Sequence, residues 1–248
     1  MRVRLGLPAD FFVYERDADF EHWDTMYPPV SRENVASRIV HQITDTDKAN
    51  RLLDVLMSAA TAMREYSSGC PPPAAVQPIQ PTMRDNPKML YTIQHEMSEA
   101  AWDAREKFVK TRLEYGTDEP TTAHSQMLIF TRPKPNTDAR HVSFDDSDNN
   151  CLNMLHCGVQ LAMGPAKTMF QRDARIISSM DMASFFTTLR LHPDIRNFWC
   201  YQSGAHNRLH TNQMVQGNSE SPAIALAFLE RVLGECGLKD LLMIYSGR

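Results

Sequence analysis

The spacing of apolar residues predicts two helices near the start of the chain. Apolar side chains recur every three or four residues, the period of an amphipathic helix, at Leu52, Leu53, Leu56, Ala59, Ala60 and Met63. This helix is predicted to begin at Thr46 or Asp47. Ser31 can cap an earlier helix that runs to about Ile43, because its hydroxyl can accept a bond from an otherwise unpaired backbone N–H. We therefore expect residues 1–69 to form an N-terminal helical extension.

A proline-rich stretch follows, and it predicts a break in the domain organisation. Residues 70–81 contain Pro71, Pro72, Pro73, Pro78 and Pro81. Proline lacks the backbone donor and clashes with the preceding turn, so no helix can continue through this stretch. An extended, semi-rigid linker is predicted here, which leaves residues 82–248 as the main domain.

The main domain opens with a predicted long helix. Asn86 is a good N-cap, and Pro87 suits the first helical position. An apolar face follows at Met89, Leu90, Ile93, Met97, Ala100, Ala101 and Phe108. The pattern predicts one helix from Asn86 to about Glu114, ended by Gly116.

The rest of the chain alternates short strands and helices. Strands are predicted at residues 127–130, 142–144, 176–182, 198–202, 208–213 and 241–245, with a proline-containing turn at 131–136. Helices are predicted at 184–190, ended by Pro193, and at 222–233, begun by Pro222. This order predicts an α+β domain, an antiparallel sheet backed by helices.

Composition fits one sizeable globular unit and offers no general basic surface. Hydrophobic residues make up 42% of the 248 residues, charged residues 23%, and the formal net charge is -4. Nucleic-acid binders usually carry a basic surplus, so any such contact must come from local clusters. Arg132, Lys134 and Arg140 form one such cluster. A phosphate track and a set of solvated surface charges fit this cluster equally well.

Cysteine usage and hydropathy indicate an intracellular protein without a membrane span. The five cysteines are an odd number and contain no C-x-x-C pair, so reduced thiols are expected. The longest purely apolar run, residues 223–229, is far shorter than a membrane-crossing helix. The sequence predicts no particular oligomeric state.

Asp181 is the strongest candidate for chemistry. It ends the predicted strand 176–182, and a strand end aims a side chain rigidly. Transfer of a nucleotide onto a 3′-hydroxyl is commonly run by two divalent ions, which prefer carboxylate oxygens. The alternative is an Asp that caps the short helix after it.

Two longer stretches carry a family resemblance. Residues 181–194 resemble motif A, and residues 214–223, with Gln-Gly and Ser-Pro, resemble motif B of LTR-retrotransposon reverse transcriptases, which are RNA-directed DNA polymerases. Residues 140–150 resemble the fingers segment of that family only with a one-residue shift, which matches Arg140, Asp145 and Asn150. The resemblance spans about residues 82–246 and implies reverse-transcriptase-like fingers and a truncated palm behind the N-terminal helical extension.

The resemblance also implies the metal ligands and the partners. Asp181 would hold the catalytic ions, Mg²⁺ or Mn²⁺, and Met182 would offer a backbone carbonyl to the second ion. The partners would be an RNA/DNA template-primer and a deoxynucleoside triphosphate.

Nucleotide contacts follow from the same resemblance. Phe186 falls at the aromatic position that packs under the sugar and excludes a 2′-hydroxyl, which points to deoxynucleotides; its alternative is a plain core aromatic. Gln216 and Gly217 would contact the nucleotide and the template strand. Arg132, Lys134 and Arg140 would contact the triphosphate, because guanidinium and ammonium groups complement phosphate oxygens.

The end of the sequence departs from the family. Where motif C carries paired aspartates after Tyr-x, this chain has Gly247 and Arg248 after Tyr245 and Ser246. One carboxylate holds two ions poorly, so we expect no DNA polymerisation by this polypeptide.

Three readings stay open at this point. The chain is a fragment of a retroelement polyprotein's polymerase, a non-catalytic relic that binds nucleic acid or a partner, or a small α+β interaction protein. The third reading treats the order and spacing of the two motifs as coincidence.

Overall fold

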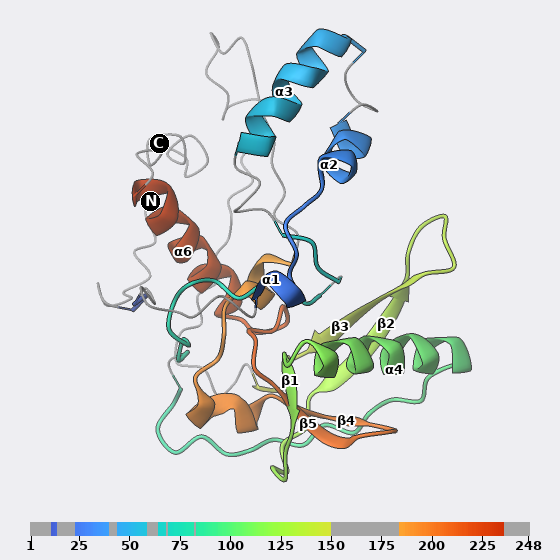
Figure 1. Cartoon of the computed structure of the whole chain (residues 1–248). Coiled ribbons are helices and arrows are strands. Elements are labelled where there is room, and N and C mark those ends of the chain that lie inside the picture. Colours follow the sequence, from blue (N-terminus) through green and yellow to red (C-terminus); the bar gives the residue numbers. More distant parts are fainter. Residues whose placement is uncertain are drawn as a thin grey trace, which may run out of the picture.

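The computed structural model combines two small antiparallel sheets with helices (Figure 1). It describes residues 11–13, 23–39, 44–58, 64–67, 69–81, 83–149 and 184–235. The α-helices are α1 (Trp23–Met26), α2 (Arg32–Ile39), α3 (Thr46–Ser58), α4 (Glu99–Glu114) and α6 (Ser221–Glu235). The strands are β1 (Asp118–Pro120), β2 (Leu128–Pro133), β3 (Arg140–Asp145), β4 (Cys200–Ser203) and β5 (Asn207–Thr211). Two 3₁₀ helices are η3 (Phe185–Thr188) and η4 (Pro193–Phe198).

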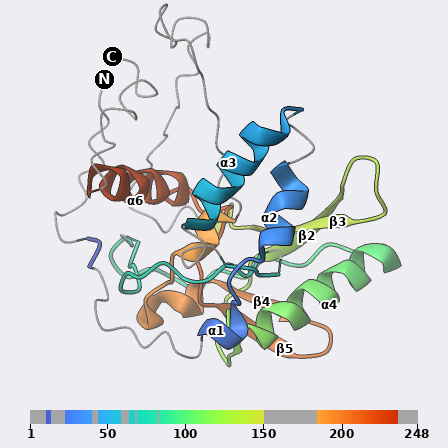
Figure 2. The same cartoon turned by 45° about the horizontal axis from the view of Figure 1, so that its top comes forward.

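The strands form two antiparallel sheets that share α4 as their cover. β2 and β3 make a hairpin in which Leu128 faces Asp145 and Pro133 faces Arg140. The second sheet has the order β1-β5-β4, so β5 is its central strand. α4 contacts β1, β2 and β3, whereas α2 and α3 contact each other and project away from both sheets (Figures 1 and 2). The antiparallel sheets and their helical cover confirm the predicted α+β class.

Local patterns located most of the short elements. Ser31 caps α2 through its hydroxyl, 3.1 Å from the backbone nitrogen of Asn34. The predicted hairpin at 198–213 is β4 and β5, and the helix begun near Pro222 is α6. β2 runs on to Pro133, so part of the predicted turn at 131–136 is strand. The predicted strands at 176–182 and 241–245 lie outside the described residues.

The long helix predicted from Asn86 is wrong in its first half, because that stretch pairs with the chain before β2. Asn86 has a φ of 52°, and α4 starts only at Glu99, where Ser98 caps it. The Thr92 amide donates to the Gln126 carbonyl at 3.0 Å, and the Gln126 amide donates to the Leu90 carbonyl at 2.8 Å. These non-local bonds replace those that a helix would make. Gly116, with a φ of 61°, does follow the helix end as predicted.

The helix predicted at 184–190 is a 3₁₀ turn of four residues, η3. Pro193 does not simply end it, since the ring opens a second 3₁₀ helix, η4, at its first position. Proline suits this place because its missing N–H would be unpaired at a helix start in any case.

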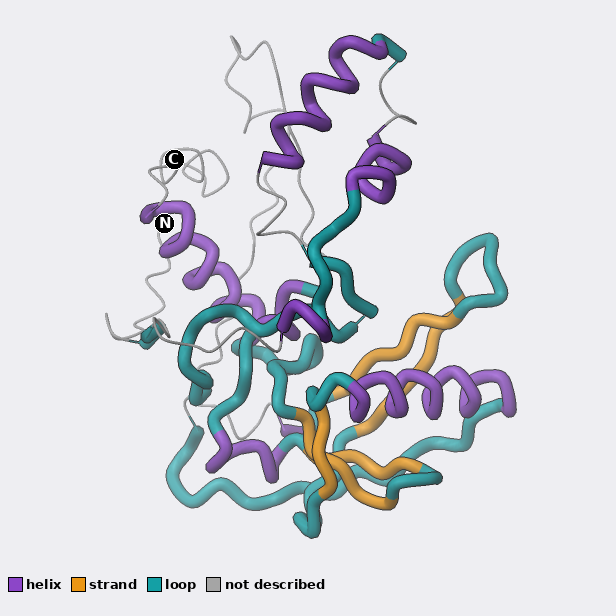
Figure 3. Tube along the Cα trace, viewed as in Figure 1, coloured by secondary structure: helices purple, strands orange, loops and turns teal. Residues whose placement is uncertain are grey.

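Residues 70–81 run without helix or strand, as expected of a proline-rich stretch, and belong to the loops drawn in teal in Figure 3. They also contribute side chains to the core. Val76 and Ile79 are buried, and the Ile79 amide donates to the Arg190 carbonyl at 2.7 Å. The stretch therefore packs against the chain that follows η3. The division of the chain at 1–69, 70–81 and 82–248 stays a prediction.

One hydrophobic core joins the two sheets and α6. Its side chains come from α4, both hairpins, the 3₁₀ segments and α6, and include Val109, Ile129, Phe144, Trp199, Tyr201, Leu209 and Ile224. Phe144 of β3 and Tyr201 of β4 lie with ring centroids 5.3 Å apart, which links one sheet to the other. Among the helices that the structure describes, none combines the length and the apolar character needed to cross a bilayer.

A buried ion pair at the end of α4 ties this core to the three-stranded sheet. Arg112 is 1% exposed, and its Nε and Nη2 donate to the two carboxylate oxygens of Asp118 at 2.6 and 2.7 Å. The same guanidinium donates to Thr211 Oγ1 of β5 at 2.8 Å and to the Gly69 carbonyl at 3.1 Å. The Tyr201 hydroxyl of β4 donates to Asp118.

Both charges of this pair are stabilised by each other. Burial lowers the pKa of Arg112, but the Asp118 carboxylate outweighs it, so the pKa of Arg112 is raised and the guanidinium stays charged. Burial and the Asp118 charge also raise the pKa of Tyr201, which keeps its hydroxyl a donor. α4, β1, β4 and β5 are thus held at one point by charge-assisted bonds.

Arg112→Met is expected to lower the free energy of unfolding by about 3–5 kcal/mol, because Asp118 would remain buried without its cation. Urea unfolding followed by circular dichroism measures the change. Lys110→Met is the matched control on the same helix. Lys110 is exposed and 4.0 Å from Glu114, and its loss should cost less than about 0.5 kcal/mol. Equal effects of the two substitutions would contradict the role given to the buried pair.

Candidate nucleotide and template site

The predicted metal ligands cannot be placed. Asp181 and Met182 lie outside the described residues. Within the described part of the chain, no three His, Cys, Asp or Glu side chains gather as a metal-binding group. Among the described residues, the candidate site is therefore the protein surface around Phe186, Gln216 and Gly217.

The chain after Phe186 pairs with the chain before Gln216. The Met214 amide donates to the Leu189 carbonyl at 2.9 Å, and the Leu191 amide donates to the Asn212 carbonyl at 2.7 Å. An antiparallel bridge between Arg190 and Gln213 lies between these bonds. The two stretches that resemble motifs A and B are thus side by side, though 30 residues separate Phe186 from Gln216 in sequence.

Two adjacent phenylalanines anchor the first of these stretches. Phe185 stacks on Phe228 of α6, with ring centroids 6.3 Å apart and an interplanar angle of 29°. Phe186 is partly buried against the hydrophobic core. Ser184, just before them, has a left-handed φ of 55°, which turns the chain into η3. A half-buried ring at Phe186 is compatible with both of its readings, a sugar-contacting aromatic and a core aromatic.

The turn that follows Val215 is fixed by its own hydrogen bonds. The Ser221 hydroxyl donates to the Val215 carbonyl at 2.6 Å, and the Glu220 amide donates to Asn218 Oδ1 at 2.9 Å. Ser221 and Glu220 are buried, while Gln216 is exposed. The turn therefore presents the Gln216 side chain to solvent from a rigid support at the start of α6.

Gly217 lies directly against the backbone at the end of β3. A Cβ atom at this position would be 2.8 Å from the Asp146 amide nitrogen and 3.0 Å from the Phe144 carbonyl oxygen. No side chain fits there without movement of the backbone. Gly217 therefore lets the turn approach the β2–β3 hairpin closely, and its predicted contact with the nucleotide and the template strand stays a prediction.

Asp146 fastens the same contact with its side chain. Its carboxylate is 1% exposed and accepts bonds from Trp199 Nε1 at 2.8 Å, Asn218 Nδ2 at 3.1 Å and Asn149 Nδ2 at 2.8 Å. Burial raises the pKa of Asp146 to about 6, although the three donors act in the opposite direction. The hairpin, the chain before β4 and the motif B turn meet at this one group.

Sequence reasoning missed Asp146 and matched its neighbour Asp145 to the fingers segment. Asp145 is only partly buried, and its carboxylate accepts from the Ser147 amide at 3.0 Å, a local turn contact. The alternation of side chains between the two faces of a strand could have pointed to Asp146 as a buried residue. Phe144 points into the core, and the residue two positions later shares its side of the chain.

The three predicted phosphate-binding cations lie on the hairpin, nearer its turn than its base. Arg132 stacks on Phe130 at 5.1 Å from the ring centroid, and Lys134 is exposed. Arg140 donates from Nε to Thr131 Oγ1 at 2.9 Å. Arg140 is four residues from Phe144, or about 13 Å along a strand. These cations are therefore separate from Gly217, and their role stays a prediction.

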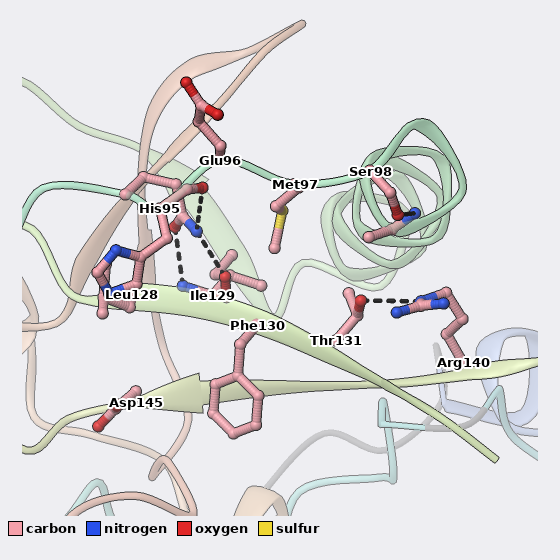
Figure 4. A pocket seen from close by; sticks show the side chains of 12 residues that line it. His95, Glu96, Met97, Ser98, Leu128, Ile129, Phe130, Thr131, Arg140 and Asp145 are labelled. Carbon is pink, nitrogen blue, oxygen red and sulfur yellow. Dashed lines mark hydrogen bonds between the residues drawn. The ribbon is translucent and has the colours of Figure 1, made fainter.

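Arg140 lines a cavity beside α4 (Figure 4). The cavity has a volume of about 310 Å³ and lies between β2, the chain at Gln94–Ser98 and the start of α4. Gln94 holds that chain to β2, since its side chain donates to the Ile129 carbonyl at 2.8 Å and accepts from the Ile129 amide at 3.1 Å. Arg140 thus faces α4 rather than the Gln216 turn.

Gly217→Ala is expected to cost about 1–3 kcal/mol of stability, because the added methyl must push backbone atoms apart in a packed site. Chemical denaturation measures the loss. Gln216→Ala is the control one residue away, where an exposed side chain is removed and a change within about 0.5 kcal/mol is expected. If Gly217→Ala leaves the free energy of unfolding unchanged, the turn does not pack closely against the end of β3.

Stability should depend on pH through Asp146. The pKa of Asp146 is raised, so the folded protein binds an extra proton between about pH 4 and pH 6. The free energy of unfolding of the wild type, minus that of Asp146→Asn, should therefore rise as the pH falls from 7.5 to 4.5, by about 2 kcal/mol. Asp145→Asn serves as the control, and a flat difference for Asp146→Asn would contradict the burial of its charge.

Comparison with known proteins yields likeness in structure alone. No protein-family model and no curated protein matches the sequence. A foamy viral protease-reverse transcriptase in complex with double-stranded DNA superposes with a TM-score of 0.63 at 13% identity, covering 88% of this chain. Two structures of the prototype foamy virus protease-reverse transcriptase, a mutant and the native protein, give TM-scores of 0.60 and 0.61, also at 13% identity, and cover 84% of this chain.

This chain spans 42% of the length of the first of those proteins and 27% of the other two. The likeness agrees, at the level of the fold, with the resemblance carried by the two motif stretches. Over most of its length, this chain has a reverse-transcriptase-like fold.

Proposed function

We propose that this chain is the fingers and part of the palm of a retroelement reverse transcriptase, a piece of a polyprotein that binds an RNA/DNA template-primer and a deoxynucleoside triphosphate. One observation carries the proposal. The stretch with Phe186 and the turn with Gln216 and Gly217 lie side by side, and the turn is seated on the β2–β3 hairpin. By resemblance, the first stretch would contact the sugar of the nucleotide, and the turn would contact the nucleotide and the template strand.

The DNA-bound neighbour supports the same assignment. The foamy viral protein of the same fold was solved with double-stranded DNA. In this chain, the exposed Arg132 and Lys134 on the hairpin would contact phosphates of the template strand or of the nucleotide. Gln216, held outward by its turn, would contact the nucleotide and the template strand.

The metal site is proposed from the sequence. Asp181, with the Met182 carbonyl, would hold Mg²⁺ or Mn²⁺, which would polarise the reacting phosphate. Phe186 would pack under the sugar of the incoming nucleotide. Because half-buried Phe186 is backed by the hydrophobic core, it is fixed in place for such a contact.

Catalysis by this polypeptide is not proposed. Gly247 and Arg248 stand where the family carries its paired aspartates, and a guanidinium would repel the cations. The second candidate function, a non-catalytic relic that binds nucleic acid or a partner, rests on this departure. Both functions allow nucleic-acid binding, and they differ in whether the protein takes part in catalysis.

Binding is tested by fluorescence anisotropy with a labelled RNA/DNA hybrid at several salt concentrations. Arg132→Ala/Lys134→Ala is expected to weaken binding about tenfold or more near 0.15 M salt. It should also reduce the slope of log K against log salt by about 2, one for each lost phosphate contact. The control, Lys107→Ala/Lys110→Ala, removes two exposed charges from α4 and should leave the slope unchanged.

A wild type that does not bind the hybrid, or two double variants that lose affinity equally, would overturn the proposed binding. Primer extension on the same hybrid separates binding from chemistry. We expect no dNTP incorporation by this polypeptide. Incorporation that disappears in Asp181→Ala would show that the chain is catalytic as it stands.

A further inference from the structure

A second cavity is also lined by the Gln94–Met97 segment, and one of its lining residues carries a buried charge. The proposed function does not use this charge. The cavity has a volume of about 490 Å³ and lies between α4, that segment and the turn that joins β4 to β5. The volume is in the range of small-molecule sites, roughly 300–1,000 Å³. It is separate from Phe186, Gln216 and Gly217, none of which lines it.

Arg105 of α4 is the charge. The residue is 1% exposed and lines the cavity. Its Nε is buried without a hydrogen-bond partner. Burial lowers the pKa of Arg105, but an arginine stays protonated near neutral pH. A buried, charged donor without an acceptor is unfavourable, so an anion in the cavity would be stabilised.

The nearest carboxylate is already engaged. Glu106 accepts bonds from the Ser203 hydroxyl at 2.9 Å, the Gly204 amide at 3.2 Å and the Ala205 amide at 3.4 Å. It therefore fixes the turn between β4 and β5, and its charge also acts on Arg105, where it opposes the effect of burial on the pKa. Arg105 Nε is left as a buried donor without an acceptor in a residue that lines the cavity.

The other lining groups define what kind of anion fits. Trp102 covers one face of the guanidinium, with Arg105 Cζ 4.7 Å from the ring centroid, and packs on Gly204, where a Cβ would be 2.6 Å from Trp102 Cζ2. Met97 adds a second apolar wall. Glu96 also lines the cavity, and with Glu106 nearby it disfavours a dianion such as phosphate.

We propose that this cavity binds a carboxylate, paired to the Arg105 guanidinium, whose apolar body lies against Trp102 and Met97. A guanidinium matches a planar carboxylate through two parallel hydrogen bonds, and the single negative charge limits repulsion by Glu96 and Glu106. The carboxylate comes from a free small molecule or from the C-terminus of a peptide. The proposal is independent of template-primer binding.

The test uses the full chain and follows the indole N–H resonance of Trp102 in ¹⁵N-resolved NMR spectra. Benzoate is expected to shift this resonance with a Kd on the order of 1 mM. Benzamide, of the same shape without charge, should not shift it. This comparison needs no variant, so it holds even if a substitution at Arg105 prevents folding.

Arg105→Gln is expected to weaken benzoate binding about tenfold or more, because the charged donor is lost. Arg105→Lys keeps the charge but loses the planar pair of donors. Its affinity for benzoate should lie between those of the wild type and Arg105→Gln. Lys110→Gln removes one charge from an exposed position of the same helix and should bind benzoate as the wild type does.

Two further comparisons identify the chemical class of the bound anion and the source of the carboxylate. Inorganic phosphate should bind more weakly than benzoate, and tighter phosphate binding would overturn the carboxylate assignment. N-acetyl-glycyl-phenylalanine is compared with its amide; a free-acid peptide tighter than benzoate assigns a peptide C-terminus, and a weaker one a free small carboxylate. No shift with either carboxylate, or an equal shift in Arg105→Gln, would overturn the proposal.

Discussion

The buried pair of Arg112 and Asp118 is the constraint on which the other contacts depend. Neither charge can be left alone in the interior, so the end of α4 has one position relative to β1. The same guanidinium binds Thr211, whose hydroxyl lies 3.3 Å from the Gln213 carbonyl. Gln213 forms an antiparallel bridge with Arg190 and lies three residues before Gln216 in the sequence. A single ion pair in the core thus fixes where the turn at Gln216 can be.

Asp146 and Gly217 form the second fixed point, between the hairpin and the turn. A glycine allows the two backbones to touch, and a carboxylate with three donors holds them together. The arrangement joins the β2–β3 hairpin and the turn at Gln216 into one unit. This unit carries the exposed Gln216 at one end and the exposed Arg132 and Lys134 towards the far end of the hairpin.

Local patterns in the sequence predicted those elements whose reasons are local. The period of α3, the hairpin around 203–207 and the proline near the start of α6 are examples. The start of α4 was wrong because Leu90 and Thr92 bond to Gln126, a partner 30 or more residues away. Asp146 escaped notice for the same reason, since two of its three donors, Trp199 and Asn218, are 53 and 72 residues away in sequence.

The candidate site was proposed from the resemblance of two sequence stretches, and the structural neighbours agree with that resemblance at the level of the fold. The pairing of residues 189–191 with 212–214 could not be predicted from propensity, but it brings the two stretches side by side, as the proposed site requires. Hydrogen–deuterium exchange with and without an RNA/DNA template-primer tests this most directly. The account predicts slower exchange at 186–191, 213–218 and the β2–β3 hairpin on binding. Protection confined to α2 and α3, or none despite binding, would contradict it.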